Sequence, residues 1–282
     1  MTMTKTKTMT PTLPPTSELE ALRPNLVFLR LRRIAEIYEA EAKRAVKIKS
    51  SYSAYLNRLV EEEVLAKSER SVNARVNKAR FPMLKTIENF DFAFQPSISE
   101  VMVKELATLT FIQAAENIVL LGPPGVGKTH LAIGLGFKTC AARKKVFFAS
   151  ALALMDDLMA AAVSHNLPVR LEVLSRLDLL IIDELGYLPM DKQRANLFFQ
   201  LVCQRYEKGS IIITSNKTFS QWGEIFGDDV IASAILDRLL HHCHIIPIQG
   251  ESYRIKDKRT KTMLFQSQYV NILPSINVNF RF

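Results

Sequence analysis

The chain has 282 residues, of which 48% are hydrophobic, and it carries 37 Lys and Arg against 28 Asp and Glu. This length and apolar content suit one large core with a small accessory domain, and they exclude a largely disordered chain. No apolar run approaches the roughly 18 to 20 residues of a membrane span, and the start "MTMTKTKTMTPTLPPTS" lacks the apolar core of a signal peptide. We therefore expect a cytoplasmic protein with no membrane partner.

The excess of positive charge lies at the two ends of the chain. Residues 1–80 hold 16 Lys and Arg against 9 Asp and Glu, and residues 250–282 hold 6 against 2, whereas residues 81–249 hold 15 against 17. Basic flanks on a neutral module favour a polyanionic partner such as DNA, because Lys and Arg that neutralise phosphates supply most non-specific affinity. Solubilising charge on exposed helices is the alternative.

Residues 1–20 are rich in Thr and Pro and lack apolar periodicity, so we expect a disordered lead there. Apolar residues then recur at helical spacing over 21–80, which predicts a small all-helical N-terminal domain. Three basic clusters lie in this domain, at 30–33, 43–49 and 75–80. Three clusters on one small domain favour a binding surface for DNA or a protein partner over solvated helix faces.

From residue 81 short apolar runs rich in β-branched residues alternate with helical stretches. The runs lie at 117–122, 145–150, 177–186, 210–216 and 243–248. Continuously apolar strands are typical of a parallel sheet that helices cover on both faces. We therefore predict an α/β domain over 81–260, a three-layer αβα sandwich with a five-stranded parallel sheet, whose ligands bind beyond the carboxyl ends of the strands.

The segment "GPPGVGKT", residues 122–129, follows the first of these strands and precedes a helix. It matches the G-x-x-x-x-G-K-[ST] spacing of a phosphate-binding loop in the structural context that the motif requires. Glycines let successive backbone N–H groups point inward, the lysine reaches the β- and γ-phosphates, and the threonine hydroxyl is a ligand for Mg²⁺. We assign the nucleotide contacts to Gly122, Pro123, Pro124, Gly125, Val126, Gly127, Lys128, Thr129 and the next residue, His130.

Polar residues end the third and fourth predicted strands, at the sheet edge where the loop also emerges. In "LLIIDE" two adjacent carboxylates follow a buried run, and we assign Asp183 to the metal ion and Glu184 to the base that polarises the attacking water. In "IIITSN" we assign Asn216 to orienting that water, whereas Thr214 and Ser215 are interpreted as ordinary polar residues of a strand end. The run "HHCH" at 241–244 does not predict a zinc site, because adjacent side chains on a helix or strand diverge and the sequence offers no second ligand cluster.

These motifs together resemble those of the AAA+ ATPases and, within that class, the IstB-like insertion-sequence ATP-binding proteins, which are relatives of bacterial replicative helicase loaders. The resemblance rests on "ENFDFAFQPS", "ENIVLLGPPGVGKTHLA", "LLIIDELGYLP", "ITSN", "ILDRLLHHC" and "GESYR", which lie between residues 88 and 254. It implies an ATP hydrolase that uses ATP and Mg²⁺. It also implies a helper of transposition that oligomerises on double-stranded DNA and delivers target DNA to, or stimulates, the transposase of its element.

The same resemblance implies roles for two arginines. Arg238 would be an arginine finger in the ATP site of the neighbouring subunit, and Arg254 a second sensor arginine. The sequence itself supports this role for Arg238, since a lone guanidinium in an otherwise apolar helix needs an anionic partner. An ion pair with Asp237 of the same chain stays open as the alternative. A helical insertion at 149–177 would face DNA, although Arg170 and Arg176 are its only cations.

A second function stays open at this level, that of an adaptor that loads a replicative helicase and uses ATP as a regulatory switch. The form of the N-terminal domain and the segment "DELGYLPMD" favour the transposition helper. Residues 261–282 depart from the family pattern, which usually ends soon after the basic segment, so we assign no function to this tail.

Overall fold

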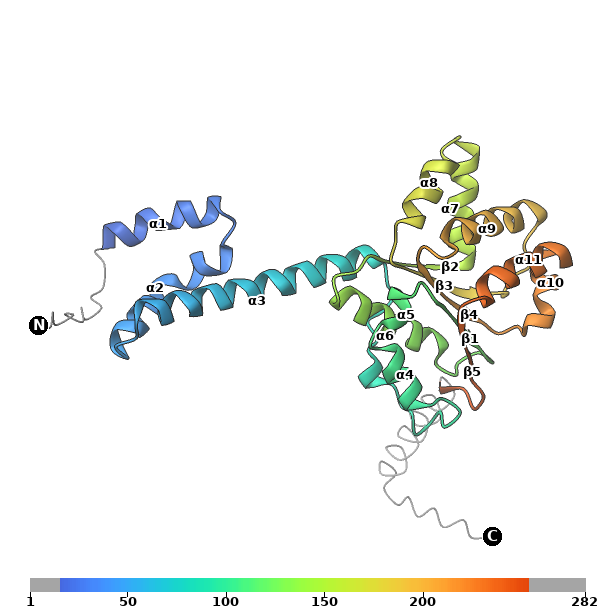
Figure 1. Ribbon diagram of the computed structural model, residues 1–282, viewed down its shortest axis with the longest axis horizontal. Helices are drawn as coiled ribbons and strands as arrows, with labels where there is room; N and C mark the ends of the chain where they lie inside the picture. Colours follow the sequence, from blue (N-terminus) through green and yellow to red (C-terminus); the bar gives the residue numbers. More distant parts are fainter. Residues whose placement is uncertain (1–15, 254–282) are drawn as a thin grey trace, which may run out of the picture. The chain divides into compact units, whose positions relative to one another are not determined.

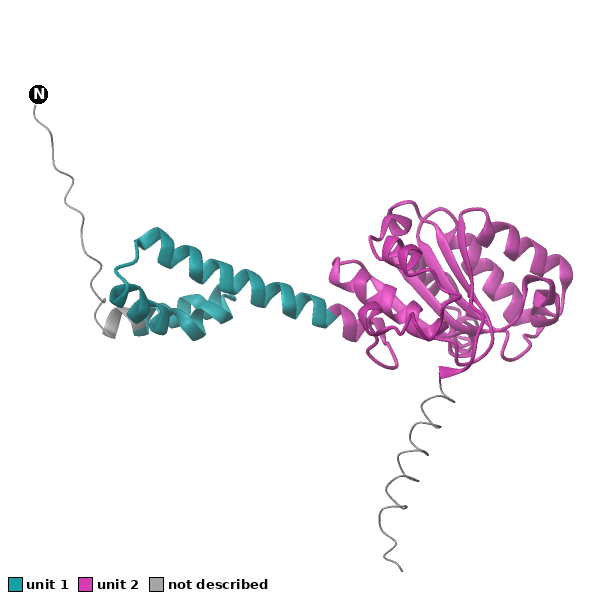
Figure 2. Cartoon of the chain, turned by 90° about the horizontal axis from the view of Figure 1, so that it is seen from below, with its two compact units in different colours: residues 1–74 teal, residues 75–282 magenta. Residues whose placement is uncertain are grey.

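The computed structural model describes residues 16–253, which form two compact units that divide between residues 74 and 75 (Figure 2). Within the described residues no helix is both long enough and apolar enough to cross a membrane. The three cysteines are free thiols. Burial raises the pKa of Cys140 to about 11 and that of Cys243 to about 12, so these two thiols stay protonated and unreactive near neutral pH.

The first unit contains three helices, α1 (Thr16–Phe28), α2 (Arg32–Lys47) and α3 (Tyr52–Ala79), the last of which continues into the second unit. Its core is small and consists mainly of Leu26, Ile34, Ala35, Tyr38 and Leu59. The helical N-terminal region is therefore present as predicted. α1 begins at Thr16, within the segment 1–20 that the sequence predicts to be a disordered lead. Residues 1–15 and the tail 261–282 lie outside the described residues.

The first turn of α2 depends on a side chain from another helix. Leu31, at the N-cap of α2, supplies no capping hydrogen bond. Instead the carboxylate of Glu63 on α3, which is 3% exposed, accepts a hydrogen bond of 3.0 Å from the backbone N–H of Ile34 and one of 2.9 Å from Arg70. Since the helix N-terminus also carries partial positive charge, Glu63 fixes α2 against α3.

The second unit is built on a five-stranded parallel sheet, which confirms the predicted fold class (Figure 1). The strands are β1 (Asn117–Leu121), β2 (Val146–Ser150), β3 (Leu179–Leu185), β4 (Ser210–Ser215) and β5 (Cys243–Pro247). Their order across the sheet is β2-β3-β4-β1-β5. The strands that precede the predicted loop, the acidic pair and Asn216 are therefore three neighbours in the middle of the sheet.

Helices cover both faces of the sheet because successive residues of each strand point to opposite sides. On one face Ile118, Leu120, Ile181 and Ile212 pack with the helices α4 (Glu100–Leu106), α5 (Thr110–Gln113) and α6 (Lys128–Ala141) and the 3₁₀ turn Ile87–Asn89. On the other face Val119, Ile182 and Ile213 pack with a second set of helices. These are α7 (Ala151–Val163), α8 (Leu167–Ser175), α9 (Lys192–Arg205), α10 (Trp222–Phe226) and α11 (Asp229–Leu240), with the 3₁₀ turn Phe219–Gln221 before α10.

The expected helical insertion is present as α7 and α8, between β2 and β3. Both of its cations are engaged: Arg170 pairs with Asp157 at 2.6 Å and Arg176 pairs with Glu172. Since each guanidinium already faces a carboxylate, these two residues give the insertion little free positive charge for DNA.

Candidate ATP-binding site

The predicted phosphate loop lies between β1 and α6. The backbone N–H of Gly122 donates to the carbonyl of Ser215 at 3.1 Å, so the loop starts anchored to the end of β4. Gly127 has a φ of 100°, and a Cβ there would stand 2.6 Å from the ring of Phe90. Only glycine satisfies both the left-handed backbone and this close approach.

Lys128 places its ammonium group inside the loop. Its Nζ donates to the carbonyl oxygens of Gly122 at 2.6 Å and Pro123 at 2.7 Å. A cation held by two loop carbonyls at the N-terminus of α6 makes this end of the helix attractive to phosphate, since the N-terminal backbone N–H groups and the dipole add positive charge.

The loop is joined to the sheet through one carboxylate. Asp183, at the end of β3 and 7% exposed, lies 2.9 and 3.1 Å from the hydroxyl of Thr129, which donates to it. A second hydroxyl, that of Thr214 on β4, donates to the Asp183 Oδ1 atom at 2.6 Å. A carboxylate beside a threonine hydroxyl is a donor set that suits Mg²⁺, which prefers oxygen ligands. The two residues predicted to hold the metal ion thus lie in contact.

Glu184, the last but one residue of β3, and Asn216, which directly follows β4, are both exposed. They line one cavity of about 610 Å³ together with the loop residues 124–130 and Thr214. The cavity thus brings together the predicted base, the predicted water-orienting amide, the lysine and Thr129. Its other wall comes from residues that sequence reasoning did not assign to the site: Met83, Lys85, Asn89, Phe90, Asp91, Gln95, Tyr187, Ser215 and Tyr253.

His130 also lines this cavity, but its ring is engaged with the neighbouring segment. The Nε2 atom lies 2.8 Å from the carbonyl oxygen of Thr86, and the ring meets that of Phe90 edge to face. Burial lowers the pKa of His130, which favours the neutral ring. His130 thus ties α6 to the segment that forms the cavity wall.

Arg238 lies on α11 and is not among the residues that line this cavity. Its Nη1 atom donates to the carbonyl of Ala234 at 2.9 Å, and the guanidinium stacks 4.9 Å from the ring centroid of Phe199 on α9. No carboxylate of residues 16–253 forms an ion pair with Arg238, so the alternative pair with Asp237 is not formed. Arg254 lies outside the described residues.

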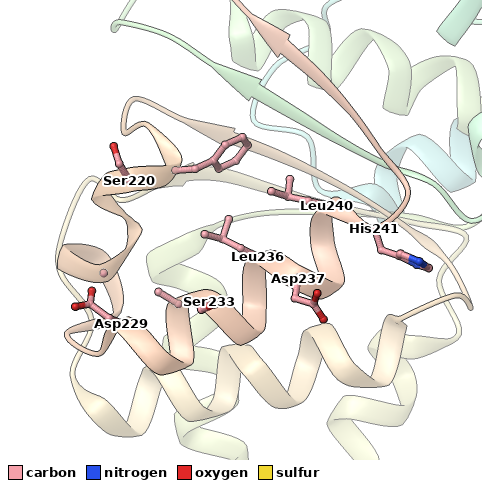
Figure 3. Close-up of a pocket in the computed structure, with 10 residues that line it drawn as sticks. Ser220, Asp229, Ser233, Leu236, Asp237, Leu240 and His241 are labelled. Atoms are coloured by element: carbon pink, nitrogen blue, oxygen red, sulfur yellow. The ribbon is translucent and has the colours of Figure 1, made fainter.

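The same helix borders a second cavity of about 540 Å³, which Figure 3 shows. Leu236 and Leu240 of α11 line it with Asp229, Asp237 and Ser220, and none of the loop residues contributes to it.

At the end of α11, possible ligand atoms of Glu207, His241 and His242 lie within 4.8 Å of one another on the surface. The divergence expected of adjacent side chains on a helix or strand does not apply to His241 and His242, because α11 ends at Leu240 and the chain turns there, and their ring centroids lie 4.1 Å apart.

Comparison with known families agrees with this geometry. A model of the IstB-like ATP binding proteins matches residues 25–261, which is most of the chain. This chain belongs to the IstB-like ATP-binding protein family. The match includes the loop, the acidic strand end, Asn216 and Arg238.

Relatives of this IstB-like protein come from bacterial insertion sequences. The chain is 47% identical over 247 residues to an ATP-binding protein of insertion sequence IS21 from Pseudomonas aeruginosa, with 88% of this chain and 92% of the relative covered. It is 46% identical over 231 residues to one of insertion sequence IS5376 from Geobacillus stearothermophilus, covering 82% of this chain and 92% of the relative.

Among solved structures, AMPPCP-bound DnaA from Aquifex aeolicus has a similar fold, with a TM-score of 0.53 at 20% identity. The similarity covers 66% of this chain and 57% of DnaA, and it shows the fold alone. The IstB-like protein thus has the predicted α/β fold, with the phosphate loop between β1 and α6.

The sequence interprets Thr214 as an ordinary strand-end residue, whereas in the structure its hydroxyl donates to Asp183 and it lines the cavity. A signal existed, because a polar residue inside the apolar run "IIIT" on a strand beside the acidic strand is buried and needs a partner. The wall at 83–95 overlaps the run "ENFDFAFQPS", which supports the family resemblance, but that run gives no chemical reason to assign its residues to the site.

Proposed function

We propose that this IstB-like protein is a Mg²⁺-dependent ATP hydrolase that assists the transposition of an insertion sequence. The observation that supports hydrolysis most strongly is the junction of Thr129, Asp183 and Thr214 beside the exposed carboxylate of Glu184. The similarity to insertion-sequence proteins at 46–47% identity favours a role in transposition over helicase loading.

In this proposal the residues of the phosphate loop and of the strand ends have separate tasks. Lys128 and the N-terminus of α6 hold the phosphates, and Thr129 and Asp183 hold Mg²⁺. The ion, when bound, would withdraw negative charge from the phosphate oxygens. Glu184 accepts a proton from the attacking water and Asn216 orients that water with its amide. The exposure of both side chains is consistent with access to water in the cavity.

Variants that separate ATP binding from ATP hydrolysis test these assignments. Glu184→Gln keeps the shape of the side chain and removes the base, so ATP binding should persist while turnover falls ~10²- to 10⁴-fold. Lys128→Ala should abolish ATP binding itself, because it removes the cation from the loop. Fluorescent-nucleotide titration and phosphate release measure the two effects. Wild-type turnover by Glu184→Gln would show that Glu184 is not the base.

We also propose that the ATP sites are shared between subunits of an oligomer. Arg238 does not line the cavity of its own chain, and no described carboxylate pairs with it. A guanidinium that an aromatic ring holds on a partly exposed helix face is available to an anion on another molecule. An arginine finger from a neighbouring subunit would stabilise the negative charge that develops on the phosphate during hydrolysis.

A mixture of two inactive variants tests this sharing. Lys128→Ala and Arg238→Ala each keep what the other lacks, so co-assembled mixtures should regain part of the ATPase activity that each has lost. The loss in Arg238→Ala alone should be ~10³-fold or more. Asp237→Asn, on the same helix turn, should keep wild-type activity. If co-assembled mixtures stay inactive, Arg238 acts only within its own chain.

We further propose that the first unit contacts double-stranded DNA through phosphates, and that a transposase of the same element is the protein partner. Several of its cations already pair with carboxylates, among them Arg33 with Glu62 and Arg58 with Glu41. Six others are exposed and form no ion pair among residues 16–253. They are Arg23, Arg30, Arg32, Lys43, Lys47 and Lys49. A cation without an ion pair can bind a phosphate without first breaking a contact to a carboxylate.

Replacing Arg32, Lys43 and Lys47 together with Ala should weaken DNA binding and lower its dependence on salt, by a slope of ~0.9 for each lost phosphate contact. The matched control replaces three paired surface cations of the second unit, Lys104, Lys144 and Arg176. Fluorescence anisotropy over a salt series compares the two triple variants on unrelated duplexes. Equal effects of the two triple variants would show that the basic clusters only solubilise the chain.

A deletion that tests the first unit as a whole should end at residue 74, because Ala79 is buried in the second unit.

A further inference from the structure

The pairing of β3 with β4 is interrupted at the acidic pair. Ile182 pairs with Ile213 and Leu185 pairs with Ser215, so Asp183 and Glu184 together stand opposite the single residue Thr214. This is a β-bulge, in which an extra residue re-aims the side chains of one strand. Glu184 has a φ of 61°, a left-handed conformation that is rare and unfavourable for a residue with a side chain.

One hydroxyl group holds both halves of this bulge. The Thr214 Oγ1 atom donates to the Asp183 Oδ1 atom at 2.6 Å and accepts from the backbone N–H of Glu184 at 2.9 Å. Thr214 is 1% exposed, so water does not readily replace these bonds. A threonine hydroxyl has one hydrogen to donate and two lone pairs to accept, which is what this double contact requires.

The neighbouring hydroxyl groups do not hold both acids as Thr214 does. Ser215 donates to the carbonyl of Leu185 at 2.7 Å and so holds the strand after the bulge, not the acids themselves. Thr129 also donates to Asp183, but it belongs to the phosphate loop and is partly exposed. Within residues 16–253, Thr214 is the residue whose side chain contacts both Asp183 and Glu184.

We propose that Thr214 is a positioning residue for both acids: its hydroxyl aims the carboxylate of Asp183 at the metal ion and fixes the backbone that presents Glu184 to the attacking water. This inference rests on the proposed ATPase function. Valine has nearly the shape of threonine, but it would leave the Glu184 N–H without its acceptor and Asp183 with one donor fewer. Partners that orient a metal ligand are commonly worth ~10- to 100-fold in metal affinity or activity.

The test compares Thr214→Val and Thr214→Ser in the full chain. Thr139→Val is the matched control, because Thr139 is also buried and its hydroxyl donates to a carbonyl of its own helix, that of Leu135. The first readout is Mn²⁺ binding by electron paramagnetic resonance in the presence of AMPPCP. The second is phosphate release, with kcat and the KM for ATP measured separately. The fluorescence of Trp222, which is buried in the second unit, reports folding.

Thr214→Val should bind Mn²⁺ ~10-fold or more weakly and lower kcat ~10- to 100-fold, with the KM for ATP changed less than ~3-fold. Thr214→Ser should stay within ~3-fold of wild type in each quantity, since it keeps the hydroxyl. If a folded Thr214→Val matches Thr139→Val in Mn²⁺ affinity and kcat, the proposal is wrong. If Thr214→Val does not fold, loss of the same two quantities in Thr214→Ser would also overturn it. A wild-type chain without turnover would refute the ATPase function but leave the Mn²⁺ comparison decisive for Thr214.

Discussion

The hydrogen bonds from two threonine hydroxyls to the carboxylate of Asp183 hold the site together. One threonine belongs to the phosphate loop and the other to β4, so Asp183 joins the loop to the sheet. The carboxylate is 7% exposed, and a buried charge of this kind is tolerable only when its oxygens accept hydrogen bonds or contact a cation. The arrangement that makes Asp183 stable also places its oxygens beside Thr129, where an Mg²⁺ ion bound to phosphates would need them.

The strand order supplies the positions for this contact. Because β4 lies between β3 and β1, the chain segments that follow these three strands meet at one edge of the sheet. The loop follows β1, the acids end β3 and Asn216 follows β4. Parallel strands with helices on both faces leave this edge open to a ligand, which is the usual place for a site in such sheets. The segment 83–95 then closes the cavity from outside the sheet.

Local patterns predicted much of this molecule. The loop was predictable because its spacing and its strand and helix context lie in one stretch, residues 117–141, and the strands because each is a continuous apolar run. The bulge at Asp183 and Glu184 was not, because it depends on how β3 registers with a strand about thirty residues later. The same holds for the cap that Glu63 gives to α2 and for the packing of Phe90 against Gly127, which join segments 29 and 37 positions apart. Contacts of this kind are set by tertiary packing, for which a single sequence holds no periodic signal.

The most direct test of this account is a crystal structure of the chain with AMPPCP and Mg²⁺. We predict that the nucleotide lies in the cavity bordered by the loop and that the ion contacts the Thr129 hydroxyl at ~2.0 to 2.1 Å. Asp183 should reach the ion directly or through one of its waters while it keeps the bond from Thr214, and Lys128 should exchange the carbonyls of Gly122 and Pro123 for phosphate oxygens. A nucleotide bound elsewhere, or an ion held without Thr129 and Asp183, would contradict the account.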